Sequence, residues 1–190
     1  QKLADQRLQQ NLKKLSTKFV TARAAAIEDI DFAATREALK ERRDRALANL
    51  DVWLATFEEN ATRRGATVLF AETTADAARL VGEIAQRHGV RKVIKSKSMV
   101  TEEMRLNEVL GELGVQSIET DLGEYILQIN DAEPPSHIIA PVVHKDEDEI
   151  ADLFARVHQK PRLTEIPDMT REAREVLRPE FLSADMGVTG

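Results

Sequence analysis

Cysteine is absent from the 190 residues of this chain. This absence excludes disulfides, a thiolate nucleophile and thiolate ligation of an iron–sulfur cluster by these residues. Aromatic residues make up 4% of the chain and the net charge is -6, so nucleic acid is not an expected partner. No apolar run approaches the roughly 18 residues that span a bilayer, and the N-terminus has no signal-peptide core. We therefore expect a cytoplasmic protein without a membrane span.

The composition that remains is typical of a globular protein with much exposed helix surface: 42% of the residues are hydrophobic and 32% are charged. The length suits one domain with an appendage. The chain begins with Gln1 and ends at Gly190 in what resembles the start of a strand. We therefore expect it to be part of a longer protein.

Residues 1–64 are expected to form an N-terminal helical segment of two or three helices, with a weak break between Thr21 and Asp31 and a C-terminal end at Gly65. Two apolar stripes follow helical spacing, and Trp53 lies beside the second. The stripes predict core packing, although a partner surface is the alternative. Their members are Leu8, Leu12, Leu15 and Phe19 in the first stripe, and Leu47, Leu50, Leu54 and Phe57 in the second.

Residues 65–190 alternate between strand and helix patterns. Strands are expected at Thr67–Phe70, near Val90–Ile94 and at Val115–Thr120, with a helix of buried face Ala77, Leu80, Val81 and Ile84 after the first. The connections are long enough for parallel crossovers, so the pattern predicts an α/β domain with a parallel sheet.

The second half of this region carries further expected elements. Ser136–Ala140 is predicted to be a strand that ends at Pro141. Asp146–Glu149 matches a capping box before a helix with Ile150, Leu153, Phe154 and Val157 on its apolar face. The last elements expected are a loop at 161–168, a helix at 170–177 and a short helical turn beginning at Pro179.

The stretch Val90–Met104 holds the strongest chemical signal. A β-branched run breaks into Lys95, Ser96, Lys97 and Ser98, and Ser98 is a plausible N-cap for the helix that follows. Two ammonium groups and two hydroxyls beside unpaired helix N–H groups would bind a phosphate or carboxylate. A solvated turn with a capping serine explains the same residues, and the sequence leaves both interpretations open.

Other ionisable residues follow the third expected strand. His137 and His144 are seven positions apart across a proline, which matches no helical His pair, so no metal site is predicted and a polar role at a strand end is favoured. Glu119, Asp121 and Glu124 could supply a general base, but loop carboxylates are usually solvated. No serine lies in a nucleophile elbow.

Three motifs of this chain, in the same order, resemble those of the LUD-domain family, and the resemblance covers nearly the whole chain. The motifs are Lys95-Ser96-Lys97-Ser98-Met99-Val100-Thr101-Glu102-Glu103, then Glu119-Thr120-Asp121-Leu122-Gly123-Glu124-Tyr125-Ile126, then Pro135-Ser136-His137-Ile138-Ile139-Ala140-Pro141 with His144-Lys145.

The resemblance implies a three-layer α/β fold similar to the phosphosugar-isomerase and CoA-transferase-like group, with residues 65–190 as the LUD-type domain. It also implies a part in the oxidation of L-lactate to pyruvate, alongside other subunits of a lactate-utilisation system. In such proteins a ferredoxin-like module after the LUD domain binds [4Fe-4S] clusters, so none is expected in these residues. By the same resemblance, a small carboxylate or other anion is expected at Lys95, Ser96, Lys97, Ser98, Glu124, His137 and His144, with no acid or base assigned.

Two other functions remain open at this stage. The first is an anion-binding enzyme of the isomerase or CoA-transferase-like type, favoured by the two lysines at a predicted helix N-terminus. The second is an interaction module whose N-terminal helices dock a partner subunit, favoured by the Leu8 to Phe19 stripe.

Overall fold

The computed structural model describes residues 4–137 and 140–190 and divides the chain into two compact units. One unit comprises residues 13–70, and the other comprises residues 1–12 together with 71–190. None of the helices within the described ranges is both long enough and apolar enough to cross a membrane.

The unit of residues 13–70 is helical. It contains most of α1 (Gln6–Ala26), followed by α2 (Phe32–Ala48) and α3 (Leu50–Arg63). The break between α1 and α2 confirms the predicted interruption, and Asp31 caps α2 by accepting a 2.9 Å hydrogen bond from the Ala34 amide. Gly65 follows α3 with a φ of 89°, as expected of a residue that ends a helix.

The apolar stripes of these helices are not buried. Among the described residues, α1, α2 and α3 contain none that is classed as buried, and Phe19, Leu47 and Phe57 are 49%, 69% and 62% exposed. The prediction that the stripes pack in a core was therefore wrong. The second stripe also crosses from α2 to α3, because Leu47 precedes the break at Asn49 and its other members follow it. Spacing alone does not say what covers an apolar helix face.

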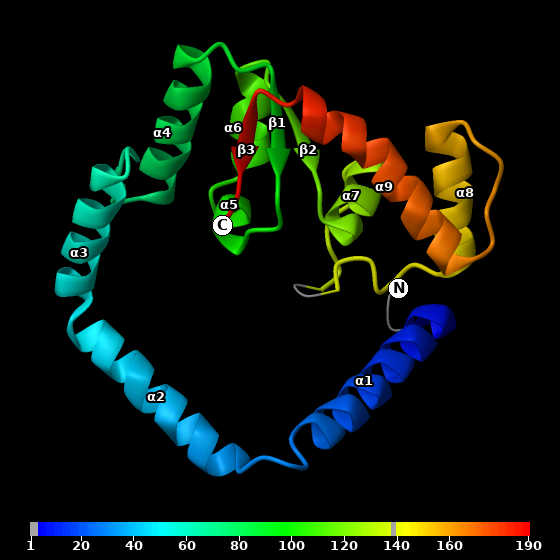
Figure 1. Cartoon of the computed structure of the whole chain (residues 1–190). Coiled ribbons are helices and arrows are strands. Elements are labelled where there is room, and N and C mark those ends of the chain that lie inside the picture. The colour runs from blue at the N-terminus through cyan, green and yellow to red at the C-terminus, as the bar shows by residue number, and fades with distance from the viewer. Residues whose placement is uncertain (1–3, 138–139) are drawn as a thin grey trace. The chain divides into compact units, whose positions relative to one another are not determined.

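The other unit is built on a parallel sheet of three strands in the order β2-β1-β3 (Figure 1). β1 (Lys92–Lys95) lies in the centre and pairs with β2 (Gln116–Glu119) and β3 (Met186–Val188). In this register Ile94 lies opposite Ile118 on one side and opposite Gly187 on the other. The predicted α/β class and parallel pairing are confirmed.

Two expected strands do not appear in the described residues. Thr67–Phe70 is not a strand, and Phe70 is 62% exposed. The position beside β1 that an early strand would occupy belongs to β3 instead. The predicted strand at Ser136–Ala140 includes residues 138 and 139, which lie outside the described residues; its described members have no strand assignment.

One face of the sheet is covered by α4 (Thr74–Arg87) and α6 (Leu106–Glu112). Thr73 caps α4, accepting a hydrogen bond from the Asp76 amide. The most buried positions of α4 are Ala78, Gly82 and Ala85, so the predicted face was displaced by one residue and its members are only partly buried. The small side chains at these positions let α4 pack closely against its neighbours. The core cluster on this face consists of Ala85, Val90, Val93, Leu106, Leu110 and Val115.

The helix predicted after Ser98 is divided into α5 (Met99–Glu103) and α6. Arg105 separates the two parts with a φ of 51°, in the left-handed region. Apolar spacing continues across this break, so the pattern did not reveal it.

The opposite face of the sheet is covered by α7 (Leu122–Ile129) and α9 (Ile166–Ser183), and α8 (Glu147–His158) packs against both helices (Figure 1). The capping box of α8 is present, with Asp146 and Glu149 exchanging side-chain and backbone hydrogen bonds. Within α8, Leu153 and Phe154 are buried as predicted, whereas Val157 is 38% exposed. Ile118, Tyr125 and Leu177 form the contact between sheet, α7 and α9.

Helix α9 differs from its prediction because it is longer and continuous. It begins four residues before the predicted start at Thr170 and runs through Pro179 to Ser183. Proline removes one backbone hydrogen bond, to the carbonyl four residues earlier. That carbonyl belongs to Glu175, an exposed residue, so water can bind it and the helix continues.

Candidate functional site

A pocket of about 300 Å³ lies beyond the carboxyl end of β1, where parallel α/β sheets usually bind ligands. Four segments meet there: the loop after β1, the start of α5, the first turn of α7 and the residues before 138. Its lining consists of Lys97, Met99, Glu102, Glu124, Pro135, Ser136 and His137.

The loop that carries Lys97 is held at both of its ends. The Ser96 amide donates to the carbonyl of Val188 at 3.0 Å, which continues the β1–β3 pairing. Ser98 caps α5, and its Oγ accepts a hydrogen bond from the Thr101 amide. The capping role predicted for Ser98 is confirmed, and Lys97 is the residue between these two anchors.

Lys97 pairs with Glu124 across the pocket wall. Its Nζ donates to Oε1 of Glu124 at 2.8 Å, and the two side chains are 28% and 14% exposed. Glu124 lies in the first turn of α7, where Asp121 caps the helix by accepting the amides of Gly123 and Glu124. An ammonium group has three donors, so Lys97 keeps donors for a ligand while it remains paired.

Lys95 lies behind the pocket instead of lining it. Its side chain is 1% exposed, and its Nζ lies 2.6 Å from Oε1 of Glu102 and 2.9 Å from Oε1 of Glu119. Burial alone would lower the pKa of Lys95, but hydrogen bonds to these two carboxylates outweigh burial and hold the pKa above its ordinary value. Lys95 is therefore positively charged, and the two carboxylates balance its charge. It contacts a residue of the pocket lining only at Glu102.

Ser136 and His137 line the pocket with Lys97, and His144 contacts Ser136 from outside this lining. The ring of His144 hydrogen-bonds to Ser136 Oγ through Nδ1 at 2.7 Å and to Glu133 Oε1 through Nε2 at 2.9 Å. His144 lines a neighbouring hollow of about 360 Å³. The Ala140 amide donates to Nδ1 of His137 at 3.2 Å, which orients that ring.

The structure thus brings together only part of the set that the sequence predicted. Lys97, Glu124 and His137 line one pocket, while Lys95 lies behind it and His144 beside it. The hydroxyl of Ser96 instead donates to Thr189 Oγ1 at 3.1 Å. Sequence reasoning assigned no ligand role to Met99, Glu102, Pro135 and Ser136, although all four lie within the motifs it singled out.

A metal site is not formed by the described residues. Over 4–137 and 140–190, no group of three or more His, Cys, Asp or Glu side chains is arranged to hold an ion. The polar groups of the pocket are an ammonium, two carboxylates, a hydroxyl and an imidazole. This set can bind an organic acid through charge and hydrogen bonds.

Comparison with known proteins gives the family of the chain. Residues 54–190 match the model of the LUD domain, which is most of the sequence. The chain belongs to the LUD-domain family. No solved structure matches it significantly.

Three curated relatives of this LUD chain carry the name Lactate utilization protein B. Lactate utilization protein B of Bacillus velezensis (strain DSM 23117 / BGSC 10A6 / LMG 26770 / FZB42) is 43% identical over 171 residues, which cover 90% of this chain and 36% of the relative. The protein of that name in Bacillus subtilis (strain 168) has the same identity and coverage. Its counterpart in Lysinibacillus sphaericus (strain C3-41) is 40% identical over 189 residues, or 99% of this chain and 40% of the relative. The LUD chain therefore spans about 36 to 40% of the length of these relatives.

Proposed function

We propose that this chain is the LUD domain of a protein that takes part in the oxidation of L-lactate to pyruvate. The name shared by its curated relatives, Lactate utilization protein B, supports a part in lactate utilisation. Because the chain corresponds to about 36 to 40% of those proteins, the reaction is proposed for the whole protein and not for these residues alone.

Within this domain, the pocket that contains Lys97 is proposed to bind the small carboxylate. The observation that carries this proposal is the Lys97–Glu124 pair, 2.8 Å long, on the wall of a pocket of about 300 Å³. A ligand carboxylate would accept from the remaining donors of Lys97, while the Ser136 hydroxyl, which already donates to the Pro141 carbonyl at 3.1 Å, could accept from a ligand hydroxyl.

The electron acceptor is proposed to lie elsewhere in the protein. Oxidation of L-lactate to pyruvate releases two electrons and two protons, and a [4Fe-4S] cluster accepts one electron at a time. The 190 residues contain no cysteine, so they do not fit the thiolate ligation of such a cluster. We propose that the clusters implied by the family resemblance are bound by residues outside this chain, and that this domain supplies a binding pocket.

The ligand test uses variants that move affinity in opposite directions. Lys97→Met removes the cation, so lactate or pyruvate affinity measured by calorimetry should fall at least about tenfold. Glu124→Gln removes the competing carboxylate, so affinity should be unchanged or higher. Lys92→Met is the matched control: Lys92 begins β1, the strand that precedes the Lys97 loop, pairs with Glu180 at 2.6 Å, has similar exposure, and lies at the opposite end of the sheet.

Equal lactate binding by Lys97→Met and the control would remove the pocket proposal. Tighter binding of a sugar phosphate than of lactate would instead favour an anion-binding enzyme of the isomerase type. Iron and acid-labile sulfide measured on the whole protein test the electron-transfer part separately, because cluster content does not depend on Lys97.

The unit of residues 13–70 is a candidate contact surface for other subunits of the lactate system. Its α3 helix exposes apolar side chains, with Trp53 and Phe57 at 53% and 62%. Trp53 is the only tryptophan of the chain, so its emission should shift to shorter wavelength when a co-purified subunit covers this face. Phe57→Ser should weaken that association and Glu58→Ser should not; equal effects would argue against this surface.

A further inference from the structure

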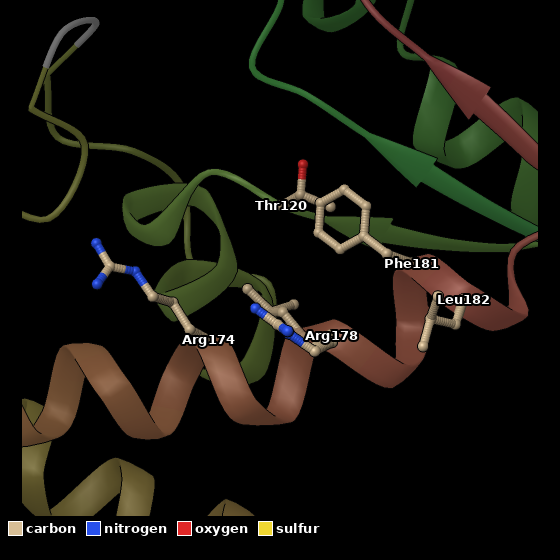
Figure 2. A pocket seen from close by; sticks show the side chains of 6 residues that line it. Thr120, Arg174, Arg178, Phe181 and Leu182 are labelled. Atoms are coloured by element: carbon tan, nitrogen blue, oxygen red, sulfur yellow. The ribbon is translucent and has the colours of Figure 1, made fainter.

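A second hollow, of about 500 Å³, lies along α9 at the carboxyl end of β2. Figure 2 shows Arg174, Arg178, Phe181 and Leu182 projecting from α9, with Thr120 on the segment that follows β2. Leu177 completes the lining. No residue is shared with the pocket around Lys97, so the two hollows are separate sites.

The charges of this hollow are of one sign. Arg174 and Arg178 are its ionisable residues, and both are exposed. Among the described residues, neither guanidinium makes a hydrogen bond or an ion pair. Each therefore presents five N–H donors to solvent at the edge of the hollow.

The spacing along α9 explains why these arginines stay unpaired. The positions three and four residues from Arg174 are Thr170, Arg171, Leu177 and Arg178, none of which is acidic. Arg178 has one carboxylate at such a position, Glu175, which lies 3.6 Å from Lys160. Like charges at i and i+4 destabilise a helix, so α9 retains an unfavourable pair beside the hollow.

The rest of the lining is mostly apolar. Leu177 is buried against Ile118 and Tyr125, and forms the inner wall. Phe181 and Leu182 are 51% and 84% exposed. Thr120 contributes a hydroxyl that already donates to the Lys95 carbonyl at 2.9 Å, so it offers a ligand only acceptor capacity. Anion binding at this hollow therefore depends on the two guanidinium groups.

We propose that this hollow binds an organic anion that joins a carboxylate or phosphate head to an apolar body larger than lactate. The head would be held by Arg174 and Arg178, whose planar donors match carboxylate and phosphate oxygens. The body would cover Leu177, Phe181 and Leu182 and remove their exposed surface from water. A bound anion also relieves the repulsion between the two guanidiniums. This site is additional to the lactate pocket and does not depend on it.

The test distinguishes the contribution of the charged head from that of the apolar body. The protein is titrated with octanoate, octyl phosphate, octanol and lactate, and binding is measured by calorimetry. We expect saturable binding of octanoate or octyl phosphate in the millimolar range or tighter, with octanol at least about tenfold weaker, and with lactate at least about tenfold weaker when it is measured on Lys97→Met, which removes the lactate pocket. Arg174→Gln with Arg178→Gln should weaken binding of the amphipathic anion at least about tenfold. Because this change removes like-charge repulsion, the double variant should fold, which thermal unfolding verifies.

Two single variants complete the design. Phe181→Ala should weaken octanoate binding and leave lactate binding unchanged. Arg171→Gln is the matched control, since Arg171 lies on the same helix, pairs with Asp168 at 3.0 Å and does not line the hollow. The proposal is overturned if neither anion saturates, if octanol binds as well as octanoate, or if the double variant binds like the control. Lys97→Met should not affect this binding, so failure here is distinguishable from failure of the lactate pocket.

Discussion

The Nζ atom of Lys95 lies 2.9 Å from Oε1 of Glu119, and the two side chains are only 1% and 5% exposed. Asn107 Nδ2 donates to the same oxygen at 2.8 Å. The other oxygen of Glu119, Oε2, is buried and has no hydrogen-bond partner within the described part of the chain. The pair thus places charge inside the domain directly behind the candidate lactate pocket.

Removing Lys95 should be severely destabilising. Lys95→Met leaves the Glu119 carboxylate buried without its cation, a change that typically costs about 3–5 kcal/mol in free energy of unfolding. Denaturant unfolding measures the cost. The control is Lys92→Met, whose ion pair with Glu180 is partly exposed and should contribute about 1 kcal/mol or less.

The double variant Lys95→Met with Glu119→Met should be more stable than Lys95→Met alone, because it removes both charges together. If Lys95→Met costs no more than Lys92→Met, the pair is not the buried electrostatic contact described above.

Glu133 should make stability depend on acid pH. Its hydrogen bond with Lys145, with further bonds from Asn130 and His144, lowers the pKa of this carboxyl from 4.5 to about 2. The stabilisation is fully present above the unfolded pKa and is lost as pH falls from about 4.5 to about 2. The Glu133 side chain is 30% exposed, so solvent screening reduces this stabilisation to roughly 1 kcal/mol in free energy of unfolding. Glu133→Gln should therefore be less stable than the parent at pH 6, by a margin that disappears near pH 2; a margin independent of pH would contradict this.

The ionisation of Tyr125 can be followed by absorbance, and its pKa reports whether the side chain is buried. Burial raises the pKa of its hydroxyl, and the charges of Glu180 and Glu172 raise it further. Because Tyr125 is the only tyrosine of the chain, tyrosinate absorbance reports on it alone. Its ionisation in the native protein should occur above the ordinary value of 10.0 that denatured protein approaches.

The stability that comes from the raised pKa of Tyr125 is fully present below pH 10. It falls as pH rises through the native pKa, because Tyr125 ionises first in the unfolded chain. Glu180→Gln should lower the native midpoint. Coincident titration of native and denatured protein would show that Tyr125 is not buried in solution.

Alanine substitution at two helix glycines should change the free energy of unfolding in opposite directions. A Cβ at Gly123, in the first turn of α7, would lie 2.7 Å from Cγ of Pro141, a rigid ring. Gly123→Ala should cost about 1–3 kcal/mol because the loop must move. A Cβ at Gly111, in α6, meets nothing within 4 Å, so Gly111→Ala should stabilise by up to about 1 kcal/mol. Thermal unfolding of the two variants compares their stabilities. Destabilisation of equal size at both sites would contradict the difference in packing around Gly123 and Gly111.

The features that sequence predicted well depend on neighbouring residues. Ser98 and the Asp146–Glu149 pair cap their helices as expected, because a cap involves atoms only a few positions apart. The apolar pattern at Val115–Thr120 also predicted a strand correctly.

The features that sequence missed depend on distant residues. Thr67–Phe70 has the composition of a strand, yet residues 186–188 occupy the place beside β1. Lys95 and Lys97 are alike in sequence, and only the fold decides that Lys95 meets Glu119 inside the domain while Lys97 meets Glu124 at the pocket. Unpaired arginines on α9 could have been noticed from their spacing, but the hollow beside them could not.

The pairing of β3 with β1 has a consequence for how the domain forms. Asp185 Oδ2 accepts the amides of Arg91 and Lys92 at 2.9 and 3.0 Å, joining residues 93 or more positions apart. Until residues 186–188 arrive, the central strand has a free edge that can pair with another chain. During synthesis β1 therefore remains open to aggregation until residues 186–188 have emerged from the ribosome.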